Sequence, residues 1–439
     1  MNIKNLLFIV IAALLFACKP ELDEVNISSG NVDFSKYVAI GNSLTAGYTD
    51  GDLFISGQTN SYPSILADQM MAAGGGEFRQ PMMTDEYGFG RRFLLDATLQ
   101  RPVPAGVPVN QQNFASIANQ GPFNNMGVPG AKSFHLVPGA ESFSLQNPYY
   151  ARFAAQPGVS TVLGEAVAQN PTFFTAWIGN NDVLGYALAG GASDSITSIG
   201  LFSLALGGVL QQLTSTGAKG AIANIPSITA APYFTFMNTQ LPYNGLVLTE
   251  PAQVAALNTG YAPLNTLIKL LGSTDTLVFA LGPNPFVIVD KDLPWGMRQM
   301  KSGELFLLTL PTDSIINHGY GSMSPIPNKY VLTGAELDRI NSAISAYNQT
   351  IMFFANDLGL AYMDANALME KVSTTGLTVD GITFTSTFVT GNTFSLDGIH
   401  LTGRANAIVA NEFIKSINSK YGSDLKEVSP LFYSGLYYY

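Results

Sequence analysis

The sequence has 439 residues, of which 47% are hydrophobic and 12% are charged. This balance excludes an intrinsically disordered chain, which combines low hydrophobicity with many charges. Lysine and arginine total 21 against 31 aspartate and glutamate residues, so the formal net charge is -10. Because such a chain has no broad basic surface for a phosphate backbone, we expect no nucleic-acid partner. The low charge leaves an integral membrane protein open until the apolar segments are compared with the length of a membrane span.

Residues 1–17 are typical of a bacterial signal peptide. Their apolar run from Leu6 to Ala17 has 12 residues, whereas a membrane-spanning helix needs about 20. The run ends directly before Cys18 in a motif that resembles the lipobox of bacterial lipoproteins. Cys18 is the only cysteine, which excludes an internal disulfide. We expect a lipid on Cys18 that anchors the protein in the outer membrane, on its periplasmic or its surface face; the alternative is an ordinary signal peptide with an incidental cysteine.

The remaining chain is predicted to form one large domain with a short segment at each end. Residues 18–36 are polar and rich in turn formers, so we expect a tether between lipid and body. Residues 37–425 form the predicted globular domain, and residues 426–439 form an aromatic C-terminal tail. The most apolar later segment, 200–210, has only 11 residues and predicts a helix packed inside the body rather than a membrane span.

Four continuous apolar runs predict buried parallel strands. They are Tyr37–Ile40, Thr172–Ile178, Ala221–Ile225 and Leu360–Met363. Helical segments lie between them, and this alternation predicts an α/β fold with a doubly wound parallel sheet and flanking helices. Two long segments, at about 51–121 and 231–330, do not fit the alternation. We interpret both as insertions on the loop side of the sheet.

Two helices are predicted with clear boundaries. Thr333 and Glu336 have the spacing of a capping box, and Gly359 ends the helix that they begin. The apolar positions of this helix step by three and four along one face: Leu337, Ile340, Ile344, Tyr347, Ile351 and Phe354. A last helix follows Gly403, and its predicted inward residues are Ile408, Val409, Phe413 and Ile417.

A serine follows the first predicted strand directly, in Gly41-Asn42-Ser43-Leu44. Ser43 is therefore expected at a strand-to-helix turn, where a helix N-terminus favours negative charge that develops nearby. The alternative is that Ser43 is a plain helix N-cap. A nucleophilic serine needs a base.

Three histidines are available as that base. His400 stands in Asp397-Gly398-Ile399-His400, so the Asp397 carboxylate can reach the imidazole around the turn and fix its tautomer. His135 and His318 have no comparable partner and are predicted to be surface or loop histidines.

Two further motifs supply hydrogen-bond donors for the oxyanion of a tetrahedral intermediate. Gly179-Asn180-Asn181-Asp182 ends the second strand, at the edge where doubly wound sheets build their sites. The segment 125–130, Asn-Met-Gly-Val-Pro-Gly, supplies a glycine loop before that strand. Each motif alone is also typical of an ordinary turn.

Together and in this order, the motifs resemble the four blocks that name the SGNH or GDSL family of serine hydrolases. The resemblance implies a flavodoxin-like fold. It also implies Ser43 as the nucleophile and His400 as the general base, oriented by Asp397. The blocks cover only the edge of the sheet, and the two insertions match nothing in the pattern.

The resemblance further implies an oxyanion hole made of the Ser43 and Gly130 amides and the Asn181 side chain. Gly127 is an alternative backbone donor to Gly130. The chain departs from the family at Asn42, where the family name has aspartate. That aspartate is not the nucleophile, the base or the triad acid, so the departure is expected to matter little.

The expected activity is hydrolysis of an acyl ester through an acyl-enzyme on Ser43. A lipid ester is favoured because the second insertion is rich in large apolar residues, including Trp295. The alternatives are a carbohydrate acetyl esterase that acts on an acylated glycan, and a surface-binding lipoprotein that keeps the fold without turnover. No cofactor is implied, and no metal is expected because the sequence has neither a His/Cys cluster nor a calcium-loop spacing.

Overall fold

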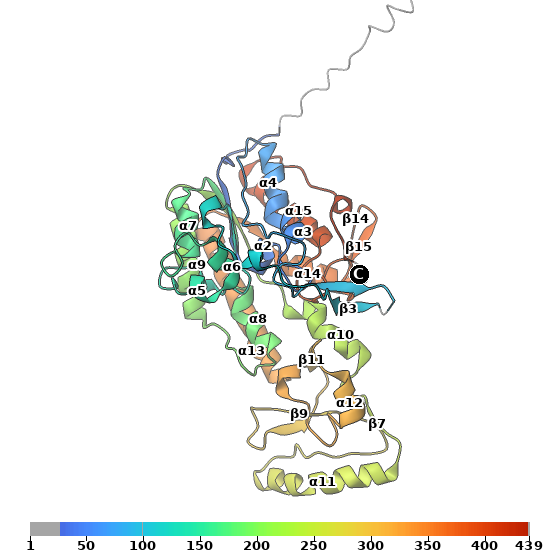
Figure 1. The fold of residues 1–439 in the computed structure, drawn as a ribbon. Coiled ribbons are helices and arrows are strands. Elements are labelled where there is room, and N and C mark those ends of the chain that lie inside the picture. The colour runs from blue at the N-terminus through green and yellow to red at the C-terminus, as the bar shows by residue number, and fades with distance from the viewer. Residues whose placement is uncertain (1–26, 99, 438–439) are drawn as a thin grey trace, which may run out of the picture.

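The protein consists of an α/β body from which one long arm projects (Figure 1). The structure is a computed structural model, and it describes residues 27–98 and 100–437. The predicted signal peptide at residues 1–17 and the predicted lipidation site Cys18 lie outside the described residues.

The body is built on a five-stranded parallel sheet with the order β13-β6-β5-β1-β4. In chain order the strands are β1 (Tyr37–Gly41), β4 (Asn125–Gly127), β5 (Phe173–Trp177), β6 (Lys219–Ala223) and β13 (Ala361–Met363). Numbered along the chain, this order is 2-1-3-4-5, the doubly wound arrangement of flavodoxin-like folds. The four predicted strands and the predicted fold class are confirmed.

Strand β4 was not predicted. Residues 125–130 were predicted to form a glycine loop, and this prediction is wrong for residues 125–127, which form β4. Asn125 and Met126 pair in parallel with Ala39 and Ile40 of β1. A segment of three residues with a single large apolar side chain carries no periodic signal of its own. The open edge of β1 decides its conformation, because that edge offers unpaired backbone groups.

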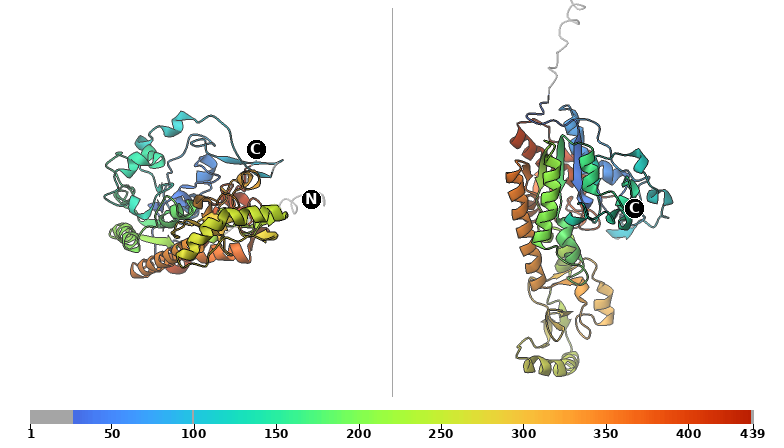
Figure 2. Two further views of the ribbon diagram at one scale, coloured as in Figure 1. Left: turned by 90° about the horizontal axis from the view of Figure 1, so that it is seen from below. Right: turned by 90° about the vertical axis from the view of Figure 1, so that its left-hand side faces the viewer.

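Helices form one layer on each side of the sheet. One layer contains α7 (Val162–Ala168), α9 (Ile199–Thr214) and α13 (Gly334–Asp357), and the other contains α4 (Tyr62–Met71) and α15 (Gly403–Tyr421). The right-hand view of Figure 2 shows α9 in green and α13 in orange alongside the strands. Further elements of the body are α2 (Ser43–Ala46), α3 (Ile55–Thr59), α5 (Phe143–Gln146), α6 (Pro148–Phe153), α8 (Asn180–Leu188), α14 (Ala365–Thr374), β2 (Phe93–Asp96), β3 (Arg101–Pro104), β14 (Leu377–Val379) and β15 (Ile382–Phe384).

The two helices with the clearest sequence signals form as predicted. Thr333 caps α13, and its side chain and that of Glu336 complete the capping box. Five of the six predicted inward residues of α13 are buried, and Leu337 at the start of the stripe is partly buried. All four predicted inward residues of α15 are buried.

The apolar segment 200–210 lies within α9, which packs against α13 in the body. Most of its hydrophobic residues are buried, as predicted, whereas Leu201 and Leu204 are exposed. Across the described ranges, no helix combines the length and the hydropathy that crossing a membrane requires.

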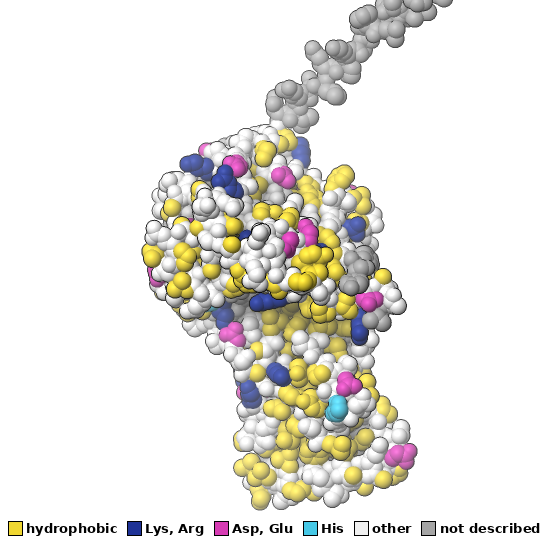
Figure 3. Space-filling view, in the orientation of Figure 1, with side chains coloured by type: hydrophobic (Ala, Val, Ile, Leu, Met, Phe, Trp, Pro, Cys, Tyr) yellow, Lys and Arg dark blue, Asp and Glu magenta, His cyan; other side chains and the backbone are white. Residues whose placement is uncertain are grey.

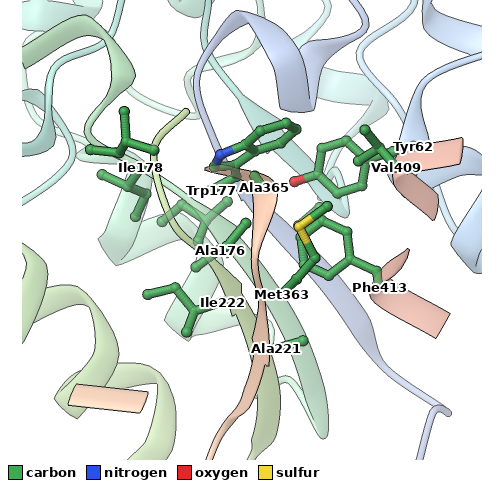
Figure 4. Close-up of a cluster of buried hydrophobic side chains, with 14 of the residues drawn as sticks. Tyr62, Ala176, Trp177, Ile178, Ala221, Ile222, Met363, Ala365, Val409 and Phe413 are labelled. Atoms are coloured by element: carbon green, nitrogen blue, oxygen red, sulfur yellow. The ribbon is translucent and has the colours of Figure 1, made fainter. Parts of the chain in front are cut away.

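The core beside the carboxyl end of β5 is built from aromatic rings (Figure 4). Trp177 at the end of β5 packs edge-on against Tyr62 of α4, with 5.7 Å between ring centroids. Tyr62 in turn stacks on Phe413 of α15 at 5.0 Å. The Trp177 indole N–H donates to the backbone oxygen of Asn224 at 2.9 Å. This packing fixes the end of β5 from which the next loop departs.

The second long segment, after β6, forms the arm, which projects from the body on the side opposite α4 (Figure 1). It contains α10 (Pro232–Gln240), β7 (Leu246–Leu248), α11 (Pro251–Leu270), β8 (Gly282–Asn284), β9 (Val287–Val289), β10 (Met297–Gln299), β11 (Leu305–Phe306) and α12 (Thr312–His318), and it returns through β12 (Val331–Leu332). The arm has two small hydrophobic cores of its own. Hydrophobic side chains are also distributed over its surface (Figure 3).

Both predicted end segments pack on the body over their described parts. The tether was expected to extend to residue 36, but Val32 and Phe34 are buried in the main core. Their apolar side chains alternate with polar ones, which is the pattern of a half-buried extended segment. At the other end, the Tyr437 ring lies 4.4 Å from the Arg92 guanidinium, and its backbone oxygen accepts a hydrogen bond from Leu95.

The capping box of α13 leads to a stability prediction. Replacing Thr333 with alanine removes the side chain that bonds the Glu336 N–H, so the free energy of unfolding should fall by about 1 kcal/mol. Thr333→Ser keeps the hydroxyl and should retain most of this stability. Urea unfolding of the two variants and the unaltered protein measures the difference. Equal stability of Thr333→Ala and the unaltered protein would show that the cap contributes nothing.

Candidate active site

The predicted nucleophile lies where β1 turns into a one-turn helix, α2 (Ser43–Ala46). Asn42 caps this helix, because its side-chain oxygen accepts the Leu44 N–H at 3.0 Å. The alternative interpretation of Ser43 as a plain N-cap is therefore wrong, and its hydroxyl serves another contact. A helix of one turn has a small dipole, so stabilisation of negative charge here depends on individual N–H groups rather than on a long helix.

The structure brings Ser43, His400 and Asp397 together. The Ser43 hydroxyl oxygen lies 2.9 Å from Nε2 of His400, although the two residues are 357 positions apart. Nδ1 of the same ring lies 2.8 Å from a carboxylate oxygen of Asp397. Ser43 is only 7% exposed, so the contact is shielded from bulk water.

The Asp397 carboxylate accepts five hydrogen bonds. One oxygen accepts from the Ser395 hydroxyl at 3.1 Å and from the backbone N–H groups of Ile399 and His400, each at 2.8 Å. The other oxygen accepts from the His400 ring and from the Gly51 N–H at 3.0 Å. Burial by itself raises the pKa of Asp397, but the charge of His400 and these hydrogen bonds outweigh it and hold the pKa well below its usual range.

An ionised Asp397 determines which nitrogen of His400 carries the proton. The carboxylate only accepts hydrogen bonds, so Nδ1 is the donor to it. Nε2 of the neutral ring then has a free lone pair, which faces the Ser43 hydroxyl. This arrangement enables His400 to take the proton of Ser43 as the hydroxyl attacks.

Of the two backbone donors considered for the oxyanion, the geometry favours Gly130. The N–H of Gly127 is already used, because it donates to the Asn125 side chain at 3.0 Å. The N–H of Gly130 makes no hydrogen bond within the part of the chain that the structure describes. Gly130 has a φ of +80°, a conformation that favours glycine, and it lines the same cleft as Ser43.

A residue that the sequence analysis missed holds the Gly130 turn. The side-chain amide of Asn147 donates to the Pro129 oxygen at 2.8 Å. Its own oxygen accepts two backbone N–H groups at the start of α6. Asn147 thereby ties the turn before Gly130 to a helix end. An Asn-Pro pair predicts a cap or a turn, but nothing in the local sequence indicates this long-range contact.

The second oxyanion candidate, Asn181, lies at the start of α8 (Asn180–Leu188). Gly179 precedes this helix with a φ of +109°, and a Cβ there would come within 2.7 Å of Ile225. The Asn181 amide donates one N–H to the Ala131 oxygen at 3.0 Å. A primary amide has a second N–H, so Asn181, which borders the cleft beside Ser43, keeps one donor for a ligand.

Asn42, where the pattern that the sequence resembles has aspartate, makes a contact of its own. The amide nitrogen of Asn42 donates to the side-chain oxygen of Asn180 at 3.0 Å. An aspartate at position 42 would have no N–H for this bond. Asn42 therefore links the turn that contains Ser43 to the turn that contains Asn181.

The cleft at Ser43 has a volume of about 800 Å³ and is lined mainly by aromatic and other apolar side chains. Tyr48, which the sequence analysis missed, lies with its ring 4.6 Å from that of His400. The arm contributes Tyr233 and Leu308. Trp295, which suggested an acyl-binding insertion, packs instead in a small core of the arm.

The other two histidines do not line the cleft. His135 stacks on Phe143 at 4.3 Å. His318 is exposed on helix α12, as predicted, and its Nε2 lies 3.3 Å from Asp313, which is also exposed. In the described ranges, no group of three His, Cys, Asp or Glu residues is arranged to hold a metal ion.

A buried carboxyl group, Asp50, joins the loop after α2 to the loop that contains Asp397. The Asp50 N–H donates to the Ser395 hydroxyl, and its side chain accepts the Leu396 N–H, both at 2.9 Å. Burial raises the pKa of Asp50 to about 7. The Asp-Gly pair at 50–51 is typical of a turn, but its contact with residues 395–397 depends on the fold.

Comparisons with known proteins leave the family of this chain open. No protein-family model matches the sequence, and no curated protein sequence matches it. Among solved structures, a protein described as GDSL-like lipase from Parabacteroides merdae covers 88% of this chain and 98% of its own, at 10% identity and a TM-score of 0.36. A mutant acetyl-xylooligosaccharide esterase from Geobacillus covers 90% and 96%, at 10% identity and a TM-score of 0.35.

An extracellular lipase from Streptomyces rimosus covers 88% of this chain and 98% of its own, at 11% identity and a TM-score of 0.33. Scores and identities this low carry no argument about family or substrate. The fold class follows from the strand order, and the candidate site follows from the contacts of its residues.

The raised pKa of Asp50 predicts a pH-dependent effect of its replacement. In the unfolded chain the carboxyl group ionises near its ordinary value of 3.8, whereas in the folded protein it ionises near 7. The carboxyl group therefore lowers stability progressively from about pH 4 to pH 7. Asp50→Asn should gain stability relative to the unaltered protein over this range, by up to about 4 kcal/mol above pH 7.

Urea unfolding between pH 4.5 and 8.5 measures this difference. Asp338→Asn, at an exposed position on α13, is the matched control and should show no comparable trend. A constant stability difference between Asp50→Asn and the unaltered protein across this range would contradict the prediction.

Proposed function

We propose that this protein is a serine hydrolase of the SGNH or GDSL type that cleaves carboxylic esters. The observation that carries the proposal is the bridging position of His400, 2.9 Å from the Ser43 hydroxyl and 2.8 Å from Asp397. Open donors on Gly130 and Asn181 border the same cleft and supply what an oxyanion needs.

The reaction begins when the Ser43 oxygen attacks the carbonyl carbon of the ester. Nε2 of His400 takes the hydroxyl proton, and the charge of Asp397 stabilises the imidazolium that forms. The carbonyl oxygen becomes negatively charged and accepts hydrogen bonds from the Ser43 and Gly130 N–H groups and from the Asn181 amide.

The tetrahedral intermediate then collapses. The bond between the carbonyl carbon and the alcohol oxygen breaks, and His400 gives its proton to that oxygen, so the alcohol leaves. A water molecule attacks the acyl-enzyme, and His400 takes its proton. A second collapse releases the carboxylic acid and returns the proton to Ser43.

One observation also favours a carbohydrate ester as substrate. The wide cleft is lined by several rings, among them Tyr48, Tyr149 and Tyr233, and aromatic faces suit the apolar face of a sugar. The argument for a lipid ester is weaker than the sequence indicated, because most large side chains of the second insertion pack the arm. A surface-binding lipoprotein without turnover is the remaining alternative.

We also propose that a lipid on Cys18 anchors the protein in the outer membrane. The support is the signal-peptide pattern and the lone cysteine that follows it. The blue N-terminal end of the described chain lies at the end of the body opposite the arm (Figure 1), so an anchor on this side would leave the arm directed away from it. Metabolic labelling with a tagged palmitate should mark the unaltered protein and not Cys18→Ser; equal labelling would contradict the anchor.

The role of Ser43 is tested by labelling and turnover together. A fluorophosphonate probe should label the unaltered protein and not Ser43→Ala, and ester hydrolysis should fall by about 10⁴-fold or more in the variant. Ser215→Ala, at an exposed position after α9, is the control and should behave like the unaltered protein. Absence of Ser43-dependent labelling on folded protein would favour the binding lipoprotein.

The role of Asp397 is tested by a variant of the same shape. In Asp397→Asn, the new side-chain amide would be able to present an N–H to Nδ1 of His400 and so favour the wrong tautomer. The substitution should therefore lower kcat by about 10⁴-fold while the protein remains folded. Circular dichroism verifies the fold, and a kcat within tenfold of the unaltered enzyme would rule out this role.

A further inference from the structure

Ser43 borders two hollows that differ tenfold in volume. One is the wide cleft of about 800 Å³, and the other is a pocket of about 80 Å³. Ser43, Asn181 and His400 line both. An ester has two substituents on its reacting group, the acyl chain and the alcohol, so two hollows of unequal size offer a way to distinguish them.

The walls of the small pocket belong to the hydrophobic core. Five of its lining side chains come from separate segments: Trp177, Ile225, Phe234, Met369 and Leu401. None of them is more than 4% exposed. Apolar groups buried here leave water and gain about 0.8 kcal/mol per methylene. The pocket therefore suits a hydrocarbon chain rather than a polar group.

The volume of the small pocket limits the length of that chain. A group of the size of a water molecule needs about 10 to 15 Å³ of pocket volume. A volume of about 80 Å³ thus admits about five to eight non-hydrogen atoms. A bulky alcohol does not fit, and neither does a chain of sixteen carbon atoms.

The order of the chemical steps indicates which part of the ester each hollow binds. The acyl group stays bonded to Ser43 after the alcohol has left, and a water molecule then reaches the carbonyl carbon beside His400. The departing alcohol and the arriving water both need an open route, which the wide cleft provides. An acyl chain held in the small pocket leaves that route free.

We propose that the small pocket binds the acyl chain and the wide cleft binds the alcohol. The enzyme then selects esters of short to medium acyl chains, of about five to eight carbon atoms, on a bulky alcohol. This inference rests on the proposed ester hydrolase function, and it adds the size of both halves of the substrate.

A series of p-nitrophenyl esters with acyl chains of increasing length tests the proposal. We expect kcat/KM to be highest between pentanoyl and octanoyl esters. The acetyl ester should be at least tenfold poorer, because three or more buried methylenes are lost. The palmitoyl ester should be at least tenfold poorer, because its chain exceeds the pocket.

Matched variants in the two hollows show which one sets the chain length. Ile228→Phe fills the small pocket and should shift the optimum to shorter chains, whereas Met369→Ala enlarges it and should shift the optimum to longer ones. Leu188→Phe and Leu308→Ala make the corresponding changes in the wide cleft and should leave the optimum unchanged. Two opposite changes in each hollow keep the test valid if one variant fails to fold.

Fluorophosphonate labelling of each folded variant separates the two proposals. If Ser43 is labelled but the optimum is palmitoyl, is acetyl, or moves only with the Leu188 and Leu308 variants, the pocket assignment is overturned and the hydrolase function stands. If folded protein shows no Ser43-dependent label, both proposals are overturned. A labelled enzyme whose optimum follows the Ile228 and Met369 variants supports both.

Discussion

The geometry of the site depends on the hydrogen bonds that stabilise one buried charge, the carboxylate of Asp397. Removing an ionised carboxylate from water costs several kcal/mol unless its oxygens find hydrogen-bond donors. Its donors come from Gly51 after the first strand, from Ser395, and from the turn that leads to His400. These segments must meet before the charge can be buried. Once they meet, the imidazole has one orientation, and that orientation faces Ser43.

The sheet and the two long segments contribute different residues to the site around Asp397. The carboxyl ends of β1 and β5 present Ser43 and Asn181, which is where a doubly wound sheet of this order opens a crevice. The first long segment supplies Gly51 to Asp397 and forms part of the wide cleft. The arm contributes Tyr233 and Leu308 to that cleft and otherwise packs on its own small cores. Most apolar residues of the arm therefore stabilise the arm itself and do not line the cleft.

The strengths and failures of the sequence predictions have the same origin. A buried parallel strand, an amphipathic helix or a capping box is encoded in neighbouring residues, so β1, β5 and α13 were predictable. Strand β4 was missed because the edge of β1 decides its conformation, and the packing of Val32 and Phe34 was missed because polar neighbours surround them. Trp295 was misread for the opposite reason, since a large apolar residue fits an arm core as well as a ligand site.

The alternation of apolar strands with helices determined the fold class, and the short motifs identified Ser43, His400 and Asp397 as candidates, because each of these signals lies in neighbouring residues. The tertiary structure decided the rest. It brought together atoms 357 positions apart, left the Gly130 amide open while Gly127 is engaged, and divided the space beside Ser43 into a wide cleft and a small pocket. Contacts of this range depend on how whole layers pack, and local sequence preferences carry no information about that packing.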